Sequence, residues 1–370
     1  MRILIVKLSS IGDVAHAMPA AALLRRALPD ARISWVVERR ASAILKGSSA
    51  IDDLIELDSR AWRKNIFQSA TITDVRAKLK QVRGLDNLNG DSGETRADIA
   101  IDFQGLIKSG IVARASRAAA RIGFETADLR EKLSRVFLTE QAPTVAFSHV
   151  IEKNLALARA AIARAGKAPE PFANLSPRDY EFPVTVAPED ESYVENAIGR
   201  TNSRFAIINP GGGWATKLWP AEAYAKLADW LWIEYGMASF ITYGPGEEQL
   251  AQSVASNCKS GAARLIDTTL KQFVALARRA SLFIGGDTGP LHLAAASRTP
   301  IVGIYGPTSP ERNGPFDQRD LVVGRNLWCR AECHRRSCWH WECMDIPVSA
   351  VMQAVSTRLA NTVEDVRVRW

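Results

Sequence analysis

The stretch RILIVKLSSIGDVAH, residues 2–16, decides the fold because it holds the first strand, a tight turn and the start of a helix. The apolar run from Ile3 to Val6 is typical of a strand buried on both faces. The segment VAHAMPAAALLRRAL, residues 14–28, has the apolar spacing of a helix. Asp13 therefore lies where the strand passes into the helix, and both a capping role and a chemical role are open.

The same strand-to-helix pattern recurs through the first third of the chain. Short apolar or β-branched runs, such as RISWVVE at 32–38 and ADIAID at 97–102, alternate with helical patterns. This alternation predicts a parallel sheet with helices on both faces. The segment from Gly84 to Arg96 is polar and rich in glycine, so we expect an inserted surface loop there.

A second alternating series begins after a cluster of prolines between residues 169 and 188, which we expect to form a linker. It extends from RFAIINP at 204–210 to PIVGIYG at 300–306. A chain of 370 residues is too long for one ordinary core. We predict an α/β protein of two doubly wound domains, 1–185 and 186–350, that face an interdomain cleft.

Composition narrows the class of protein. Apolar residues make up 47% and charged residues 24%, as in packed globular proteins. We see neither a run of about 18 apolar residues nor a cleavable signal pattern, and we expect a cytoplasmic protein. The net charge of +7 favours anionic partners. Nucleic acid is disfavoured because the chain has neither a reader motif nor aromatic platforms at groove spacing.

Two glycine-rich turns in the second half are candidates for a diphosphate site. NPGGGWATKLWP, residues 209–220, would place Thr216 and the Lys217 ammonium close to a phosphate. GGDTGPLHLAAA, residues 285–296, joins a buried strand to a helix whose unpaired N–H groups favour an anion. The alternatives are a plain tight turn, helix capping by Asp287 or Thr288, and a packed core histidine at 292. Neither segment matches the P-loop or dinucleotide fingerprints.

Two further segments carry charged side chains. YGPGEEQLAQ, residues 243–252, offers Glu247 and Glu248 either to ribose hydroxyls or to a helix start. DSRAWRKNIF, residues 58–67, groups three cations around Trp62, which suits an acceptor that bears carboxylates. A solvated basic loop is the alternative. These cations are Arg60, Arg63 and Lys64.

The first turn of the chain is the candidate catalytic site. Ser9, Ser10, Gly12 and Asp13 face the predicted cleft if both domains present the carboxyl ends of their strands to it. A carboxylate beside a partly desolvated sugar hydroxyl can act as a general base. The alternative is that Asp13 is only the N-cap residue of the helix.

Four cysteines gather near the C-terminus in CRAECHRRSCWHWEC, residues 329–343. Their spacing is only loosely like that of zinc ligands. A packed loop of cysteine and tryptophan is the favoured interpretation, and a soft-metal site is the alternative. The four are Cys329, Cys333, Cys338 and Cys343.

Several of these segments resemble glycosyltransferase family 9, the ADP-heptose:lipopolysaccharide heptosyltransferases. The matching segments are MRILIVKLSSIGDVAHAMPA, DFQGLIKSG, RIGFE, the Lys217 loop and GGDTGPLHLAAA, and they span nearly the whole chain. Within the family, DFQGLIKSG and RAWRK look most like heptosyltransferase I. The DTGP turn, the insert at 84–96 and the cysteine cluster depart from that branch.

The resemblance implies a GT-B fold with an N-terminal acceptor-binding domain and a C-terminal nucleotide-sugar-binding domain, whose last helix, 351–370, returns to the first domain. It implies an inverting, metal-independent transfer of heptose from ADP-L-glycero-D-manno-heptose to the Kdo region of the lipopolysaccharide inner core, with a lipid A-Kdo acceptor and no cofactor required. Asp13 would be the base, with Ser9, Ser10 and Gly12 beside it on the acceptor side. Arg60, Arg63 and Lys64 would face Kdo carboxylates. The donor would contact Thr216, Lys217, a glutamate at 247 or 248, Asp287, Thr288, Gly289 and His292.

The expected setting is the cytoplasmic face of the inner membrane, where the basic surface would dock peripherally on anionic lipid. Two other functions stay open. One is a family 9 transferase with a different nucleotide sugar or core acceptor, such as a heptosyltransferase II. The other is a non-catalytic protein that binds nucleotide or glycan.

Overall fold

The chain divides into two compact units, Met1–Thr185 and Val186–Trp370, and each is described by itself. The structure is a computed structural model that describes residues 1–65, 68–84, 96–169, 175–199, 204–329, 333, 337–339 and 342–367, excluding the side chains of 362–367. Most of the predicted insert at 84–96 therefore lies outside the described residues. Within the described part, no helix is both long enough and apolar enough to span a membrane.

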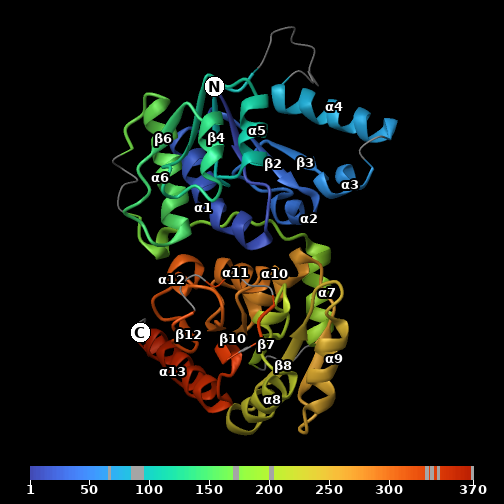
Figure 1. The fold of residues 1–370 in the computed structure, drawn as a ribbon. Helices are drawn as coiled ribbons and strands as arrows, with labels where there is room; N and C mark the ends of the chain where they lie inside the picture. The colour runs from blue at the N-terminus through green and yellow to red at the C-terminus, as the bar shows by residue number, and fades with distance from the viewer. Residues whose placement is uncertain are drawn as a thin grey trace. The chain divides into compact units, whose positions relative to one another are not determined.

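The first unit is a parallel sheet of six strands in the order β3-β2-β1-β4-β5-β6, with helices on both faces (Figure 1). Its elements are β1 Arg2–Val6, α1 Ile11–Ala27, β2 Arg32–Glu38, α2 Arg39–Ser42, η1 Ala43–Leu45, β3 Asp53–Leu57, α3 Ser59–Lys64, α4 Ser69–Arg83, β4 Ile99–Asp102, α5 Ile107–Ala115, β5 Ala120–Phe124, η2 Lys132–Phe137, β6 Glu140–Ala142, α6 Val150–Arg164 and η4 Pro177–Asp179.

The second unit repeats this order as β9-β8-β7-β10-β11-β12, again with parallel pairing. Its elements are α7 Pro188–Ile198, β7 Phe205–Asn209, η5 Ala215–Lys217, α8 Ala221–Tyr235, β8 Ala238–Thr242, α9 Glu248–Asn257, β9 Ala263–Ile266, α10 Leu270–Arg279, β10 Leu282–Gly286, α11 Gly289–Ala296, β11 Ile301–Ile304, α12 Pro310–Asn313, β12 Leu321–Val323, η6 Glu342–Met344 and α13 Val348–Arg367. The predicted pair of doubly wound α/β domains is confirmed.

Burial on both sheet faces explains the unbroken apolar strands. Leu4 and Val6 of β1 pack in one cluster with Val82 of α4 and Ala113 of α5. Successive side chains of a strand point to opposite faces, so Ile3 and Ile5, which are also buried, cover the other face. The apolar run in the opening stretch of sequence is thus a central strand.

The last helix packs on the second unit. Val351, Val355 and Leu359 of α13 join a core cluster with residues of β7 and α8. The helix also contacts β11 and β12. Its expected return to the first unit stays a prediction.

The strand order fixes where ligands can bind. In each sheet, the first three strands are added outward from the centre on one side, and the next three are added outward on the other side. The connections on the two sides of the central strand pair therefore run in opposite directions. Such a switch point opens a crevice at the carboxyl ends of the two strands. The switch points are β1/β4 in the first unit and β7/β10 in the second.

Candidate functional site

Asp13 lies at the β1/β4 switch point, in the first turn of α1. Ser10 is the N-cap residue of this helix and Asp13 the third residue after it, so the interpretation of Asp13 as the N-cap itself is wrong. The Asp13 Oδ2 atom accepts hydrogen bonds from the Ser10 N–H at 2.8 Å and the Ser10 hydroxyl at 3.1 Å. The side chain therefore helps to cap the helix with one of its two oxygens.

The other carboxylate oxygen faces a buried lysine. Asp13 Oδ1 lies 3.7 Å from Lys7 Nζ, and 26% of the Asp13 side chain is exposed. Lys7 Nζ also donates a hydrogen bond of 2.6 Å to the Phe103 carbonyl, which holds the ammonium in place. The arrangement leaves one oxygen of Asp13 beside a fixed cation, on a side chain that is partly exposed.

The environment favours the ionised form of Asp13. Burial raises the pKa of this carboxyl, but Lys7, the two hydrogen bonds from Ser10 and the nearby Arg130 together bring it below its ordinary value. The side chain is consequently a carboxylate at neutral pH, which is the form that can accept a proton.

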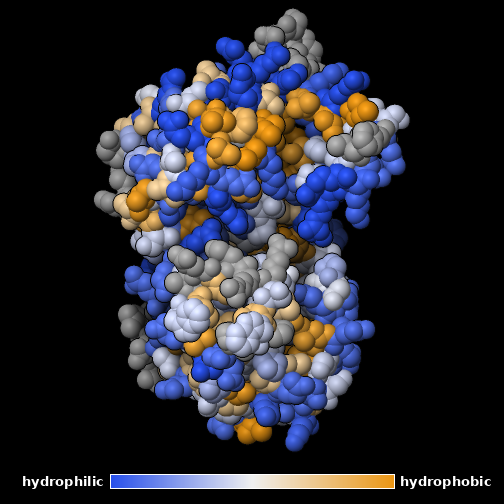
Figure 2. Space-filling view, viewed as in Figure 1, coloured by the Kyte–Doolittle hydropathy of each residue, from blue (hydrophilic) through white to orange (hydrophobic). Residues whose placement is uncertain are grey.

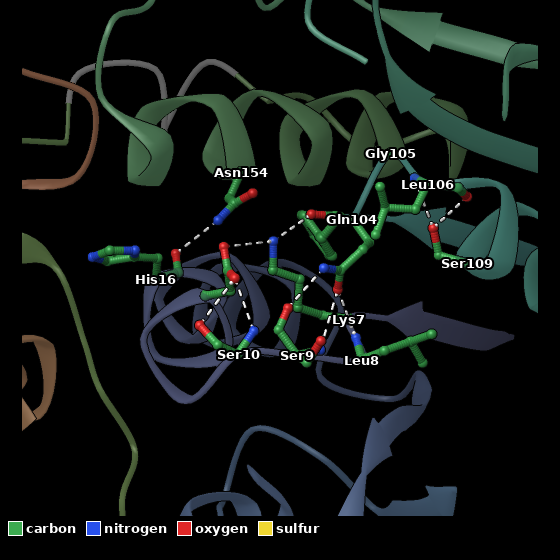
Figure 3. A network of polar contacts seen from close by, with 12 residues as sticks. Lys7, Leu8, Ser9, Ser10, His16, Gln104, Gly105, Leu106, Ser109 and Asn154 are labelled. Carbon is green, nitrogen blue, oxygen red and sulfur yellow. Dashed lines mark hydrogen bonds and ion pairs between the residues drawn. The ribbon is translucent and has the colours of Figure 1, made fainter. Parts of the chain in front are cut away.

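Gln104, which follows β4, clamps the turn that carries Asp13 (Figure 3). Its Oε1 atom accepts the Leu8 N–H at 2.9 Å, and its Nε2 donates to the Ser9 carbonyl at 2.7 Å. Asp102, fully buried at the end of β4, accepts the Gln104 N–H and the Ser109 hydroxyl. Two strands thus fix the geometry of the Lys7–Asp13 turn.

The predicted acceptor residues of this turn have different surroundings. Ser9 is partly buried and bound to Gln104, and Ser10 is exposed with its hydroxyl on Asp13. Gly12 is buried inside the first turn of α1. Their roles toward an acceptor stay predictions.

The predicted acceptor cations lie on α3, which follows the edge strand β3. Asp58 caps this helix by accepting the Ala61 N–H, and Trp62 donates to Asp74 of α4 at 2.8 Å. Arg60, Arg63 and Lys64 are exposed, and within the described residues we find no ion pair that occupies them. The structure brings the three cations together on one helix and shows no described contact with Asp13.

A buried ion pair occupies the β7/β10 switch point of the second unit. Lys217 Nζ donates to the Asp287 carbonyl and to its Oδ2, both at 2.7 Å. The ammonium also lies 4.2 Å from the centre of the Trp214 ring. An ammonium has three donors, and Asp287 takes two of them.

Asp287 gathers further groups around its carboxylate. His292 Nε2 lies 3.1 Å from its Oδ1, and the Asn313 side-chain amide donates to the same oxygen at 2.8 Å. Burial raises the pKa of Asp287, but His292 and Lys217 bring it well below the ordinary value. The predicted donor residues Lys217, Asp287 and His292 therefore form one charged network.

The turn after Asp287 carries the start of α11. Thr288 is the N-cap residue and Gly289 the first helical residue, so the N–H groups of this end lie beside the network. Gly285 has another reason to be glycine, since a Cβ there would lie 2.8 Å from the Asn209 carbonyl of β7. Packing between strands, and not room for a ligand, explains Gly285.

The structure distinguishes the two glutamates at the β8 turn. Glu247 is half-buried, accepts the Gly244 N–H at 3.0 Å, and has its carboxylate where a side chain on Gly211 would stand. Glu248 is exposed and accepts the Gly246 N–H at 3.2 Å. Only Glu247 lies against the glycine loop that leads through the buried Thr216 to Lys217.

The cysteine cluster is only partly described. All four cysteines carry free thiols, and burial together with the three other cysteines raises the pKa of Cys343. The described residues contain no group of three or more His, Cys, Asp or Glu side chains that is placed to hold a metal ion. His334 and His340 lie outside the described residues.

Sequence reasoning missed three residues of these sites. Lys7 follows β1 directly and Gln104 lies two residues after β4, and a polar residue just past a buried strand is a usable signal. Asn313 lies on the short helix α12, and no local pattern connects it with Asp287.

Comparison with known proteins gives a consistent result. Residues 91–340 match the family described as Glycosyltransferase family 9 (heptosyltransferase). Lipopolysaccharide heptosyltransferase 1 of Pseudomonas aeruginosa is 27% identical over 338 residues, which cover 91% of this chain and 87% of that protein.

Two solved structures share the fold. E. coli heptosyltransferase WaaC with ADP has a TM-score of 0.75 at 23% identity, covering 97% of this chain and 100% of that one. E. coli ADP-heptose lps heptosyltransferase II has a TM-score of 0.71 at 21% identity, covering 98% and 99%. Because the family match covers more than half of this chain, the chain belongs to glycosyltransferase family 9, the heptosyltransferases.

Proposed function

We propose that this protein transfers heptose from ADP-L-glycero-D-manno-heptose to the Kdo region of the lipopolysaccharide inner core, with inversion at the anomeric carbon. The observation that carries the proposal is the Asp13 carboxylate, held ionised by Lys7 and Ser10 at a ligand-binding switch point. The names of the relatives, lipopolysaccharide heptosyltransferase 1 and a heptosyltransferase with ADP, support the choice of donor and acceptor.

The chemistry follows from a base on one unit and an anion site on the other. The acceptor hydroxyl oxygen attacks the anomeric carbon while its proton passes to Asp13 Oδ1. The bond from that carbon to the ADP oxygen breaks, and ADP leaves with the electron pair. The reaction requires both switch points to engage one pair of substrates, so we expect them to meet across an interdomain cleft that closes.

Lys217 and the N-terminus of α11 would neutralise the charge that develops on the diphosphate. Asp287 would hold the ammonium and His292 in position, with Thr288 and Gly289 at the phosphates. Glu247, which lies against Gly211, is the better candidate for the ribose hydroxyls than the exposed Glu248. We propose that these groups replace a divalent cation, and EDTA should then leave the rate unchanged.

Asp13→Asn tests the proposal directly. Loss of the base should lower the transfer rate about 100- to 10,000-fold while ADP still binds. Asp30→Asn, an exposed change in the same unit, is the matched control and should retain the parental rate. Full activity of Asp13→Asn would exclude Asp13 as the base, and ADP binding without any turnover in the parent protein would favour a non-catalytic binder.

Thermal shifts with ADP, UDP and GDP test the donor class. A nucleotide at a hundred times its dissociation constant stabilises a protein by about 2.7 kcal/mol. Only ADP should give a shift of that size. Acceptors with and without a first heptose then separate a heptosyltransferase I from a heptosyltransferase II.

A further inference from the structure

An apolar patch lies exposed on the first unit. It consists of Ile111 on α5 and of Leu133 and Val136 on η2, with exposed fractions of 51%, 72% and 72%. Figure 2 shows apolar side chains gathered over α5, with hydrophilic side chains beyond them. Contiguous exposed apolar patches with a polar rim mark interaction sites.

Close packing brings the two elements of the patch together. A Cβ on Gly110 would lie 2.6 Å from the Phe137 ring, so α5 and η2 are in contact there. Ile111 and Phe137 line one surface hollow. Leu133 and Val136 are three residues apart on η2, so their side chains share one face of this 3-10 helix. The patch therefore spans two elements that pack on each other.

Basic residues outnumber acidic ones on and beside the two elements. Residues 107–117 and 132–137 contain five basic residues and no acidic one: Lys108, Arg114, Arg117, Lys132 and Arg135. Two carboxylates lie close by, since Glu131 accepts the Ile107 N–H and Glu38 lies 4.0 Å from Lys108. An open surface hollow of about 450 Å³ beside Ile111 is lined by Arg83, Arg114 and Arg117 together with Ala115 and Phe137. Within the described part of the chain, no ion pair engages these three arginines.

We propose that this patch, Ile111, Leu133 and Val136 with its rim of cations, docks the first unit on an anionic lipid bilayer. The aliphatic side chains enter the boundary between headgroups and acyl chains, and the arginines contact lipid phosphates. The proposal rests on the proposed function, because an acceptor that carries lipid A is anchored in a lipid bilayer. A second copy of this chain is a poorer occupant, since a two-fold contact would set like charges against each other.

Flotation with vesicles tests the proposal without any acceptor or donor. The parent protein should bind vesicles of phosphatidylcholine mixed with phosphatidylglycerol and not vesicles of phosphatidylcholine alone. Leu133→Ser with Val136→Ser should weaken this binding at least tenfold. Arg114→Gln with Arg117→Gln should weaken it about 25-fold, because each cation near an anionic surface contributes about a fivefold factor.

Matched controls come from the second unit. Ile233→Ser removes a side chain of α8 that is 74% exposed, and Lys226→Gln removes an exposed charge from the same helix. Both variants should bind vesicles like the parent. Circular dichroism and ADP-induced thermal shifts confirm that every variant is folded.

Every outcome either supports or overturns the docking proposal. Parental binding by the Leu133 and Val136 variant, or equal binding to neutral vesicles, overturns the proposal. A parental dimer that this variant dissociates would instead make the patch an interface between copies. Transfer to a delipidated acceptor distinguishes the docking proposal from the proposed function. If the parent protein binds vesicles but does not transfer heptose to this acceptor, the transferase activity is disproved and the docking proposal stands.

Discussion

Lys7 shows how one buried charge controls the candidate base. Its ammonium contacts both the Phe103 carbonyl, at 2.6 Å, and the Asp13 carboxylate, at 3.7 Å. Because the first contact fixes the ammonium, the second acts on Asp13 at a constant distance. Lys7 therefore lowers the pKa of the candidate base without needing to touch the substrate.

Lys7→Met tests this role through the pH dependence of kcat/KM. Loss of the cation should raise the pKa of Asp13, so the acidic limb of the profile should move to higher pH. The variant should also lose about 1–3 kcal/mol of stability because the buried Phe103 carbonyl loses its partner.

Lys46→Met serves as the control, since Lys46 is exposed and paired with Glu56. This change should leave the acidic limb in place. A lower rate for Lys7→Met with an unmoved limb would mean that Lys7 acts only on folding.

At the scale of elements, two close contacts hold helices in position. Gly110 lets α5 pack on η2, and Asp229 of α8 anchors the turn that follows α9. Both contacts lie away from the candidate catalytic groups, so their energies can be measured as stability.

Gly110→Ala should destabilise the first unit by roughly 1–3 kcal/mol because a methyl group would overlap the Phe137 ring. Phe137→Leu, which shortens the opposing side chain, should recover part of the loss when both changes are combined. Denaturant unfolding of the two single variants and the double variant measures this coupling. Strict additivity would contradict the contact.

Asp229 makes the stability of the second unit depend on pH. Burial raises the pKa of its carboxyl, but hydrogen bonds from Cys258, Ser260 and Lys259 bring it to about 2, against an ordinary value of 3.8. The folded-state pKa is the lower one, so the stabilisation is present above pH 3.8 and is lost as the pH falls toward 2.

Asp229→Asn should accordingly reduce stability by about 1 kcal/mol at neutral pH. The difference from the parent should shrink as the pH falls through this window. Unfolding curves measured across the window check the expectation, with the exposed Glu234→Gln as the control. A difference that does not change with pH would contradict it.

At the scale of the whole molecule, the two units repeat one topology, and each switch point holds a buried lysine beside an aspartate. The aspartate of the first pair, Asp13, keeps 26% of its side chain exposed, whereas Asp287 of the second pair keeps 6%. We propose that the same strand order serves an acceptor in the first unit and a nucleotide in the second.

This division predicts separable effects. Replacing Arg60, Arg63 and Lys64 by glutamine should raise the KM for the acceptor roughly 10- to 100-fold and leave ADP affinity unchanged. Lys217→Ala should weaken ADP by a similar factor without changing acceptor binding. Calorimetry with ADP and steady-state kinetics distinguish the two patterns, and a loss of ADP affinity in the α3 variant would contradict the division.

Much of the fold was predictable because many elements carry their own signal. The buried strands read as unbroken apolar runs, the helices have apolar spacing, and glycine or proline marks the turns. The candidate base was also predictable as a position, since Asp13 follows the first strand by a fixed turn. The protonation state of Asp13 was not predictable, because Lys7, Ser10 and Arg130 act on its carboxyl through space.

The sequence by itself determined the two α/β series, the strand-to-helix turns and the residues at them. Only the tertiary structure decided which side chains act together. Parallel pairing of β1 with β4 brings Gln104 to the Asp13 turn, and pairing of β7 with β10 brings Lys217 to Asp287. The physical reason is that sheet order joins residues 96 and 70 positions apart, beyond the reach of any local pattern.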